Sequence, residues 1–186
     1  MRVLDFDNTI YDGESILDFY LFSIRYNPRV LKYLFIVLHT TVKYKLGKTT
    51  LQDLERVVKS YAAGYLRSLP QLDSMVKAFW DKNLKKIKPW YTPQHGDVIL
   101  TASFNVIMDE LFSRLGVENC VCSIFDLKKS EAVYINFSQN KLAKFRELFG
   151  DCAVDEFYTD SKLDKPMIEI ANSAFFVKKN KITKIK

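Results

Sequence analysis

Hydrophobic and polar residues alternate in two different ways along the chain. Residues 2–7 form a short apolar run of strand length that already contains two carboxylates. Between Ser15 and about Lys88, apolar positions recur at three- and four-residue spacing with few turn signals, which predicts helices. Beyond residue 88, continuous apolar runs of strand length alternate with helical segments. The pattern therefore predicts an α/β protein interrupted by a helical insert.

The second half of the chain predicts most of a sheet. We expect strands within 97–103, 118–125, 131–137, 153–160 and 174–177, with helices within 105–116, 140–150 and 165–172. The segment 131–137 is expected to be a short hairpin arm. Alternating apolar strands and helices are typical of a parallel sheet that is covered on both faces. The predicted fold class is thus α/β, with a Rossmann-like parallel sheet core.

The helical insert has its own start and stop signals. Pro28 suits the first turn of a helix, Gly47 suits the residue after a helix end, and Thr50 is a candidate N-cap for the next helix. The longest clean apolar run, residues 33–38, is about six residues, well short of the roughly 20 that span a bilayer. We therefore expect no membrane-spanning helix here.

Composition and charge narrow the possible classes. With 186 residues, 48% of them hydrophobic, the chain can bury the core of one substantial domain, or of a core domain plus an insertion. Six Gly and five Pro, without low-complexity segments, exclude a disordered chain. Residues 14–90 hold 14 Lys or Arg against 6 Asp or Glu, so the insert is basic. A basic insert can meet anionic ligands or lipid, but it is more often a solvated helical surface.

The cysteines point to a reducing compartment. Three cysteines are an odd number without metal-type spacing, and Cys120 and Cys122 should be neighbours on one face of a buried strand. Residue 3 is not preceded by a signal-type segment. We therefore expect a cytoplasmic protein, and a peripheral membrane contact through the basic insert stays open.

The candidate chemistry lies at predicted strand ends. Asp5, Thr101 and Asp160 each close a predicted strand, and Asp7 follows Asp5 by two residues, so both can point to one side if the strand continues. In open α/β sheets, ligands bind beyond the carboxyl ends of the strands. Neighbouring carboxylates repel unless a cation or shared protons offset their charge, and oxygen ligands suit Mg²⁺. Each aspartate alone could equally be a turn or helix cap; their joint placement favours a magnesium and phosphate site.

Two further residues complete the set. Lys141 lies near the start of a predicted helix, where a cation opposes the helix dipole. An ordinary solvated lysine tolerates that, but beside carboxylates and a phosphate the charge becomes useful. Asp164 lies one helical turn beyond Asp160 and could add a carboxylate.

These residues carry a family resemblance that covers essentially the whole chain. "DFDNT" resembles the D-x-D-x-T first motif of the haloacid dehalogenase (HAD) superfamily of phosphohydrolases, in particular its phosphoserine-phosphatase-like branch. "VILTAS", Lys141 and "TDSKLD" are similar to the second, third and fourth motifs, in the family order. Asn8, Phe104 and Thr159 depart from common family residues without removing a reacting group.

The resemblance implies a role for each residue. Asp5 would attack phosphorus to form an aspartyl-phosphate, and Asp7 would protonate the leaving oxygen and later activate water. Thr101 and Lys141 would hold the phosphoryl oxygens. Mg²⁺ would be bound by Asp5, the backbone carbonyl of Asp7, and Asp160. Asp164 would support it through water or hydrogen bonds.

The resemblance also implies a domain layout and a substrate class. Residues 1–13 and 89–186 would form the HAD catalytic core, and 14–88 an all-helical cap that closes over the site. The expected function is a Mg²⁺-dependent phosphatase acting on a phosphorylated small molecule. Two alternatives stay open: a phosphatase for a lipid phosphate such as phosphatidylglycerophosphate at a membrane surface, and a non-catalytic binding module on a HAD core. We expect no nucleic-acid partner, since the sequence holds no recognition motif for one.

Overall fold

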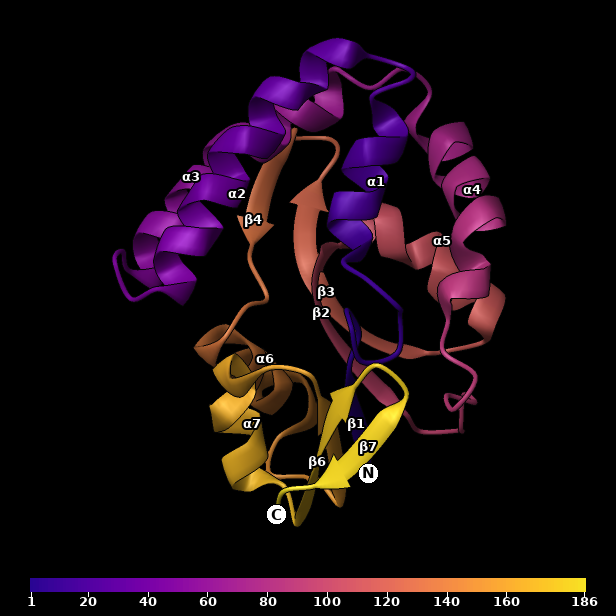
Figure 1. Cartoon of the computed structure of the whole chain (residues 1–186), viewed down its shortest axis with the longest axis vertical. Helices are drawn as coiled ribbons and strands as arrows, with labels where there is room; N and C mark the ends of the chain where they lie inside the picture. The colour runs from indigo at the N-terminus through magenta and orange to yellow at the C-terminus, as the bar shows by residue number, and fades with distance from the viewer.

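The computed structural model describes residues 1–186, apart from the side chain of Leu34. Within the described residues the sheet has seven strands in the order β4-β3-β2-β1-β5-β6-β7 (Figure 1). The strands are β1 (Arg2–Asp5), β2 (Val98–Phe104), β3 (Asn119–Asp126), β4 (Glu131–Tyr134), β5 (Glu156–Thr159), β6 (Ser173–Lys178) and β7 (Lys181–Lys184). Strands β1, β2, β3, β5 and β6 are parallel, whereas β4 and β7 pair antiparallel at the two edges. The predicted α/β class and its mainly parallel sheet are confirmed.

Alternate residues of the strands feed two separate cores. Leu4 and Ile99 belong to one apolar cluster, which includes residues of α5 (Asn105–Leu115) and of the insert. Val3 and Val98 belong to the other, which includes residues of α6 (Gln139–Phe149) and α7 (Lys165–Ile170). Because successive side chains of a strand point to opposite faces, each face of the sheet has its own helical cover.

Four helices lie between β1 and β2 in the sequence. They are α1 (Ser15–Ser23), α2 (Leu31–Lys45), α3 (Leu51–Arg67) and α4 (Leu72–Asn83), with short 3₁₀ turns η1 (Pro28–Val30) and η2 (Leu84–Lys86). Helices α1 and α4 add Phe19, Phe79 and Trp80 to the first core. Helices α2 and α3 pack side by side, and α3 also packs on β4 (Figure 1). No helix among the described residues is long and apolar enough to cross a membrane.

The local signals of the sequence act as expected. The Thr50 side chain accepts a hydrogen bond from the Asp53 backbone N–H, and Asp53 reaches back to Thr50, which forms a capping box at the start of α3. Gly116 ends α5 with a φ of 65°, a left-handed conformation that glycine adopts without strain. The sulfur atoms of Cys120 and Cys122 lie 3.1 Å apart on β3, so these residues are neighbours as predicted.

Three strand predictions need correction. Strand β1 ends at Asp5, so Asp7 lies in the following turn rather than in the strand. Strand β2 runs on to Phe104, so Thr101 lies within it, just past Leu100, the last residue that pairs with β1. The register of β2 against β3 shifts between Leu100 and Phe104. Strand β7 was not predicted, because its four residues are all exposed and carry no buried apolar run.

Candidate active site

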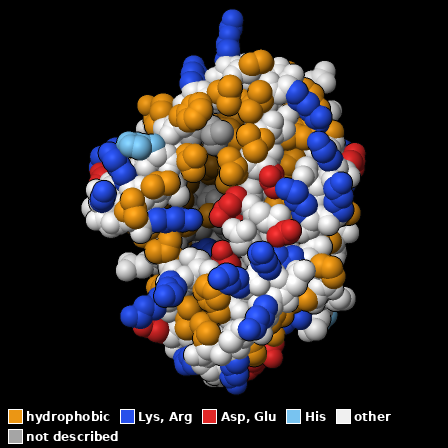
Figure 2. Space-filling view, in the orientation of Figure 1, with side chains coloured by type: hydrophobic (Ala, Val, Ile, Leu, Met, Phe, Trp, Pro, Cys, Tyr) orange, Lys and Arg blue, Asp and Glu red, His pale blue; other side chains and the backbone are white. Residues whose placement is uncertain are grey.

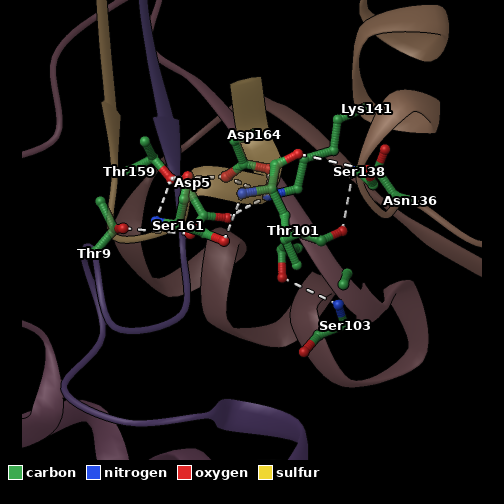
Figure 3. A network of polar contacts seen from close by, with 12 residues as sticks. Asp5, Thr9, Thr101, Ser103, Asn136, Ser138, Lys141, Thr159, Ser161 and Asp164 are labelled. Carbon is green, nitrogen blue, oxygen red and sulfur yellow. Dashed lines mark hydrogen bonds and ion pairs between the residues drawn. The ribbon is translucent and has the colours of Figure 1, made fainter. Parts of the chain in front are cut away.

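The site is built around the carboxylate of Asp5 at the end of β1. This side chain is 6% exposed, and its Oδ1 lies 2.6 Å from the Nζ of Lys141 (Figure 3). Its Oδ2 accepts a longer hydrogen bond, 3.3 Å, from the hydroxyl of Thr9. Burial raises the pKa of Asp5 well above its usual range, while the Lys141 charge opposes that rise. The carboxylate is thus fixed in place by one contact from the turn after β1 and one from the distant helix α6.

Lys141 is a buried cation held by two carboxylates. It lies in the first turn of α6, and its Nζ contacts Asp5 and, at 3.0 Å, Asp164. Burial alone would lower the pKa of the ammonium, but these two carboxylates raise it above its ordinary value. The mild cost of a cation at a helix N-terminus is therefore outweighed by two close ion pairs.

Asp164 belongs to the same buried network. It ends the 3₁₀ turn η3 (Lys162–Asp164), is 2% exposed, and accepts a 2.7 Å hydrogen bond from the hydroxyl of Thr159. Thr159 in turn is the last residue of β5, the strand next to β1. Asp164 also contacts Lys141 directly, and this contact lets Asp164 orient the Lys141 ammonium against Asp5.

Two more carboxylates face the same space. Asp7 is placed by the turn after β1, where Asn8 takes a φ of 56°, a conformation that Asn tolerates better than most residues. The backbone N–H of Ser15 donates a 2.6 Å hydrogen bond to Asp7. Burial, and then the nearby Glu14, raise the pKa of Asp7 to about 7. Asp160 follows β5 directly, and burial, together with Glu14 and Asp164, raises its pKa.

These side chains line one small pocket of about 80 Å³ at the carboxyl end of the sheet. Its lining consists of Asp5, Asp7, Glu14, Lys45, Ala102, Phe137, Lys141, Asp160, Ser161, Leu163 and Asp164. A larger depression of about 440 Å³ lies over α1, α4 and η2, but its one carboxylate, Asp18, is already paired with Lys86. The candidate catalytic side chains therefore lie in the smaller pocket.

The structure brings together five of the six predicted site residues on that lining; Thr101 is not among them. Thr101 is 1% exposed, and its hydroxyl oxygen accepts a 3.1 Å hydrogen bond from the Ser103 backbone N–H (Figure 3). Its carbonyl accepts from the Asn136 side chain. The neighbouring Ala102 faces the pocket instead, because β2 changes register at this point.

Several residues of the site escaped sequence reasoning. Glu14 and Lys45 both line the pocket, and Thr159 fixes Asp164. Glu14 comes shortly after the D-x-D-x-T motif, which was a usable signal. Lys45 had none, because it is one of several lysines in the basic insert and only the packing of α2 brings it to the pocket.

The donor set fits a magnesium ion. Within the part of the chain that the structure describes, no three or more His, Cys, Asp or Glu side chains are grouped as a metal cluster. Mg²⁺ does not need such a cluster, since it binds through one or two carboxylates and keeps several waters. The Asp5 and Asp160 carboxyls line the same pocket, and burial raises the pKa of both. A hard cation bound by the carboxylates of Asp5 and Asp160 would offset the repulsion between their negative charges.

Comparisons with known proteins agree with this architecture. A family model described as haloacid dehalogenase-like hydrolase matches residues 3–169. A protein of unknown function from Bordetella pertussis Tohama I superposes with a TM-score of 0.66 at 16% identity, covering 91% of this chain and 85% of that one. A phosphoserine phosphohydrolase-like protein from Francisella tularensis gives 0.58 at 16% identity, covering 94% and 86%.

A probable phosphoserine phosphatase from Vibrio cholerae gives a TM-score of 0.55 at 13% identity, covering 92% of this chain and 54% of that one. At these identities the structural likeness shows the fold. No curated protein matches the sequence.

Proposed function

The chain belongs to the haloacid dehalogenase-like hydrolase family, and from that premise we propose that it is a Mg²⁺-dependent phosphatase that hydrolyses a phosphate monoester. One observation carries the proposal: the buried Asp5 carboxylate lies 2.6 Å from the Lys141 ammonium, at the carboxyl end of the sheet and in a pocket lined by further carboxylates. A nucleophilic oxygen beside a fixed cation is the arrangement that attack on a phosphoryl group requires.

Asp5 is the proposed nucleophile. Its oxygen attacks phosphorus, the bond from phosphorus to the ester oxygen breaks, and an aspartyl-phosphate forms on Asp5. The leaving oxygen takes a proton from Asp7, whose pKa near 7 lets it carry one at neutral pH. Water then attacks phosphorus and gives a proton to Asp7. The bond between phosphorus and the Asp5 oxygen breaks, which releases phosphate and free Asp5.

Lys141 and Thr101 are the proposed phosphate-binding residues. Lys141 is held by Asp164, so the ammonium is positioned before substrate arrives. Thr101 uses its hydroxyl oxygen as an acceptor toward Ser103, which leaves its proton free for a phosphoryl oxygen close to Ala102. In this assignment Asp164 acts through Lys141 as well as supporting the metal.

Asp5, Asp160 and the backbone carbonyl of Asp7 would hold Mg²⁺. When bound, the ion supplies positive charge that offsets the carboxylates and the phosphoryl oxygens. Asp5 and Asp160 come from the ends of adjacent parallel strands, β1 and β5, which supports this assignment.

Residues 14–88 are the proposed cap, inserted into a catalytic core of residues 1–13 and 89–186. Glu14 and Lys45 of this segment line the catalytic pocket, which supports a role in covering the reaction from water. A pocket of about 80 Å³ holds little beyond the phosphoryl group, so the rest of the substrate would extend out of it.

We propose a small phosphorylated metabolite in the cytoplasm as the substrate. A lipid phosphate is the second candidate, favoured by the exposed apolar residues of α2, the helix that also supplies Lys45. A panel that compares both classes of phosphate monoester would separate them by kcat/KM.

Turnover of p-nitrophenyl phosphate tests the proposed function. Activity should disappear in excess chelator and return with Mg²⁺, and Asp160→Ala should lose most of it, because Lys141 offers a single positive charge to several carboxylates and the ion supplies more. Asp151→Ala, which removes an exposed acidic side chain at the end of α6, is the matched control and should behave as wild type. Full activity in chelator would contradict the metal assignment. Absence of turnover on every phosphate monoester would favour the non-catalytic alternative.

A further inference from the structure

Helix α2 exposes a continuous apolar stripe. Leu31, Phe35, Leu38, Val42 and Leu46 are 36%, 67%, 46%, 47% and 62% exposed, and we call these five residues the outer stripe. Their spacing of three or four residues places them along one side of the helix. The opposite side, with Tyr33, Val37 and Tyr44, is half-buried against other parts of the protein.

A helix that is apolar on both sides is normally buried on both sides. The neighbouring α3 follows the usual pattern, with Leu54, Ala62, Tyr65 and Leu66 buried and polar residues outside. Single exposed apolar residues need no explanation, whereas a contiguous patch marks a contact surface. The outer stripe is such a patch, because core packing does not use it.

Two further large apolar residues are exposed in the segment that precedes α2. Leu21 of α1 and Tyr26 are 53% and 43% exposed. Figure 2 shows hydrophobic side chains gathered over the part of the surface where Figure 1 places α1 and α2. This face is hollowed between them and a group of acidic side chains (Figure 2).

The charges around the patch indicate which kind of partner can bind there. Residues 19–52 contain no Asp or Glu, and their cations are Arg25, Arg29, Lys32, Lys43, Lys45 and Lys48. All six are exposed. A second copy of the chain would bring the same cations against them, so self-association through this face is opposed by like charges. A partner that is anionic and apolar together is complementary.

We propose that the outer stripe and its flanking cations dock α2 on the surface of an anionic lipid bilayer. A helix in that setting lies in the interface plane, with apolar side chains in the acyl boundary and Lys and Arg among the headgroups. Aliphatic side chains such as Leu38 and Val42 have no comparable use against a nucleic acid. Lys45 lies at the end of α2 and lines the catalytic pocket, so docking would bring that pocket close to the headgroups.

Co-sedimentation with vesicles tests the proposal without measuring catalysis. The protein should bind phosphatidylcholine vesicles that contain phosphatidylglycerol, should ignore phosphatidylcholine alone, and should dissociate as salt rises. Failure of the proposed phosphatase activity would leave this result untouched, and failure of binding would leave the phosphatase assay untouched.

Two sets of substitutions sharpen the test. Phe35→Ser with Leu38→Ser should weaken binding at least about tenfold, because each removes an inserted apolar side chain. The matched control, Leu148→Ser with Ile182→Ser, changes exposed apolar residues of α6 and β7 and should bind as wild type.

Arg29→Gln, Lys32→Gln and Lys43→Gln together should weaken binding on the order of 100-fold, since each surface cation contributes roughly fivefold. Arg146→Gln, Lys181→Gln and Lys184→Gln form the matched control for charge. Unchanged circular dichroism and thermal melting would show that the variants are folded.

Three results would overturn the proposal. The first is no binding to anionic vesicles at low salt. The second is binding that persists after Phe35→Ser with Leu38→Ser, which would show that the outer stripe is not the contact. The third is a wild-type dimer in sedimentation that those substitutions dissociate, with no vesicle binding, because a second copy would then cover the stripe.

Discussion

The catalytic end of the sheet and the outer side of α2 break the ordinary placement of residues in opposite directions. At the sheet, Asp5, Lys141 and Asp164 are 6%, 4% and 2% exposed although all three are ionisable. On α2, Phe35 is 67% exposed although it is large and apolar. Buried charges and exposed apolar patches are the informative departures in a folded protein, because neither is needed for folding.

The two regions differ in whether the folded chain offsets the free-energy cost of burying a charge or of exposing an apolar side chain. The buried charges are paired with one another at distances of 2.6 to 3.0 Å, so the fold itself compensates them. The apolar side chains of α2 have no compensation within the described protein. One region therefore holds side chains that the folded chain itself brings together and pairs, and the other leaves apolar side chains in water.

The largest expected effect is on catalysis at the sheet. Asp5→Asn should lower kcat by at least about three orders of magnitude, because an amide does not attack phosphorus. The substitution keeps the side-chain volume, and Asp164 still pairs with Lys141, so the thermal melt should show a folded protein. Asp12→Asn, an exposed change in the same turn, is the matched control and should retain wild-type kcat. Near-normal turnover by folded Asp5→Asn protein would remove Asp5 as the nucleophile.

The next effect tests whether the buried charges depend on one another. Lys141→Met leaves the carboxylates of Asp5 and Asp164 buried without their cation, and should lower the free energy of unfolding by about 3–5 kcal/mol. Urea denaturation measures the change. Lys144→Met on the same helix breaks a surface pair with Glu147, and should cost at most about 1 kcal/mol. Equal losses in the two variants would mean that the buried carboxylates of Asp5 and Asp164 do not depend on Lys141 for compensation of their charge.

The smallest expected effect concerns α2. Phe35→Ala should change the free energy of unfolding by no more than about 0.5 kcal/mol, since the ring is mostly in water already. Phe79→Ala is the matched control: its ring is fully buried, and the loss should be about 3–5 kcal/mol. Denaturant titration of both variants gives the comparison. A large loss for Phe35→Ala would place this ring in the core rather than on a free surface.

Much of the site could be predicted because it depends on local geometry. Apolar runs of strand length placed Asp5 and Asp160 at the ends of β1 and β5, and both line the pocket. The same reasoning placed Thr101 at the end of the strand predicted within 97–103, but Thr101 does not line the pocket. Strand β2 continues with Ala102, Ser103 and Phe104 after its pairing with β1 stops, and a pattern along one strand cannot show where a partner strand ends.

Other features depended on contacts between distant segments. The pairing of Lys141 with Asp5 spans 136 positions, and only the family resemblance distinguished this lysine from the half-buried Lys144 one turn later. Lys45 likewise reaches the pocket only because α2 packs where it does. For Lys45 the sequence showed only a basic insert, and the packing of α2 selected this residue among its cations.

By itself, the sequence determined the helices of the insert, the mainly parallel sheet and the carboxylates at its edge, because helix period, capping and strand length are properties of neighbouring residues. Only the tertiary structure decided which apolar residues became buried and which stayed exposed. The spacing of Phe35 and Leu38 predicted a helix but left open which of its sides another element would cover. Burial is a property of what packs against a residue, and α3 covers one side of α2 while leaving the other in water.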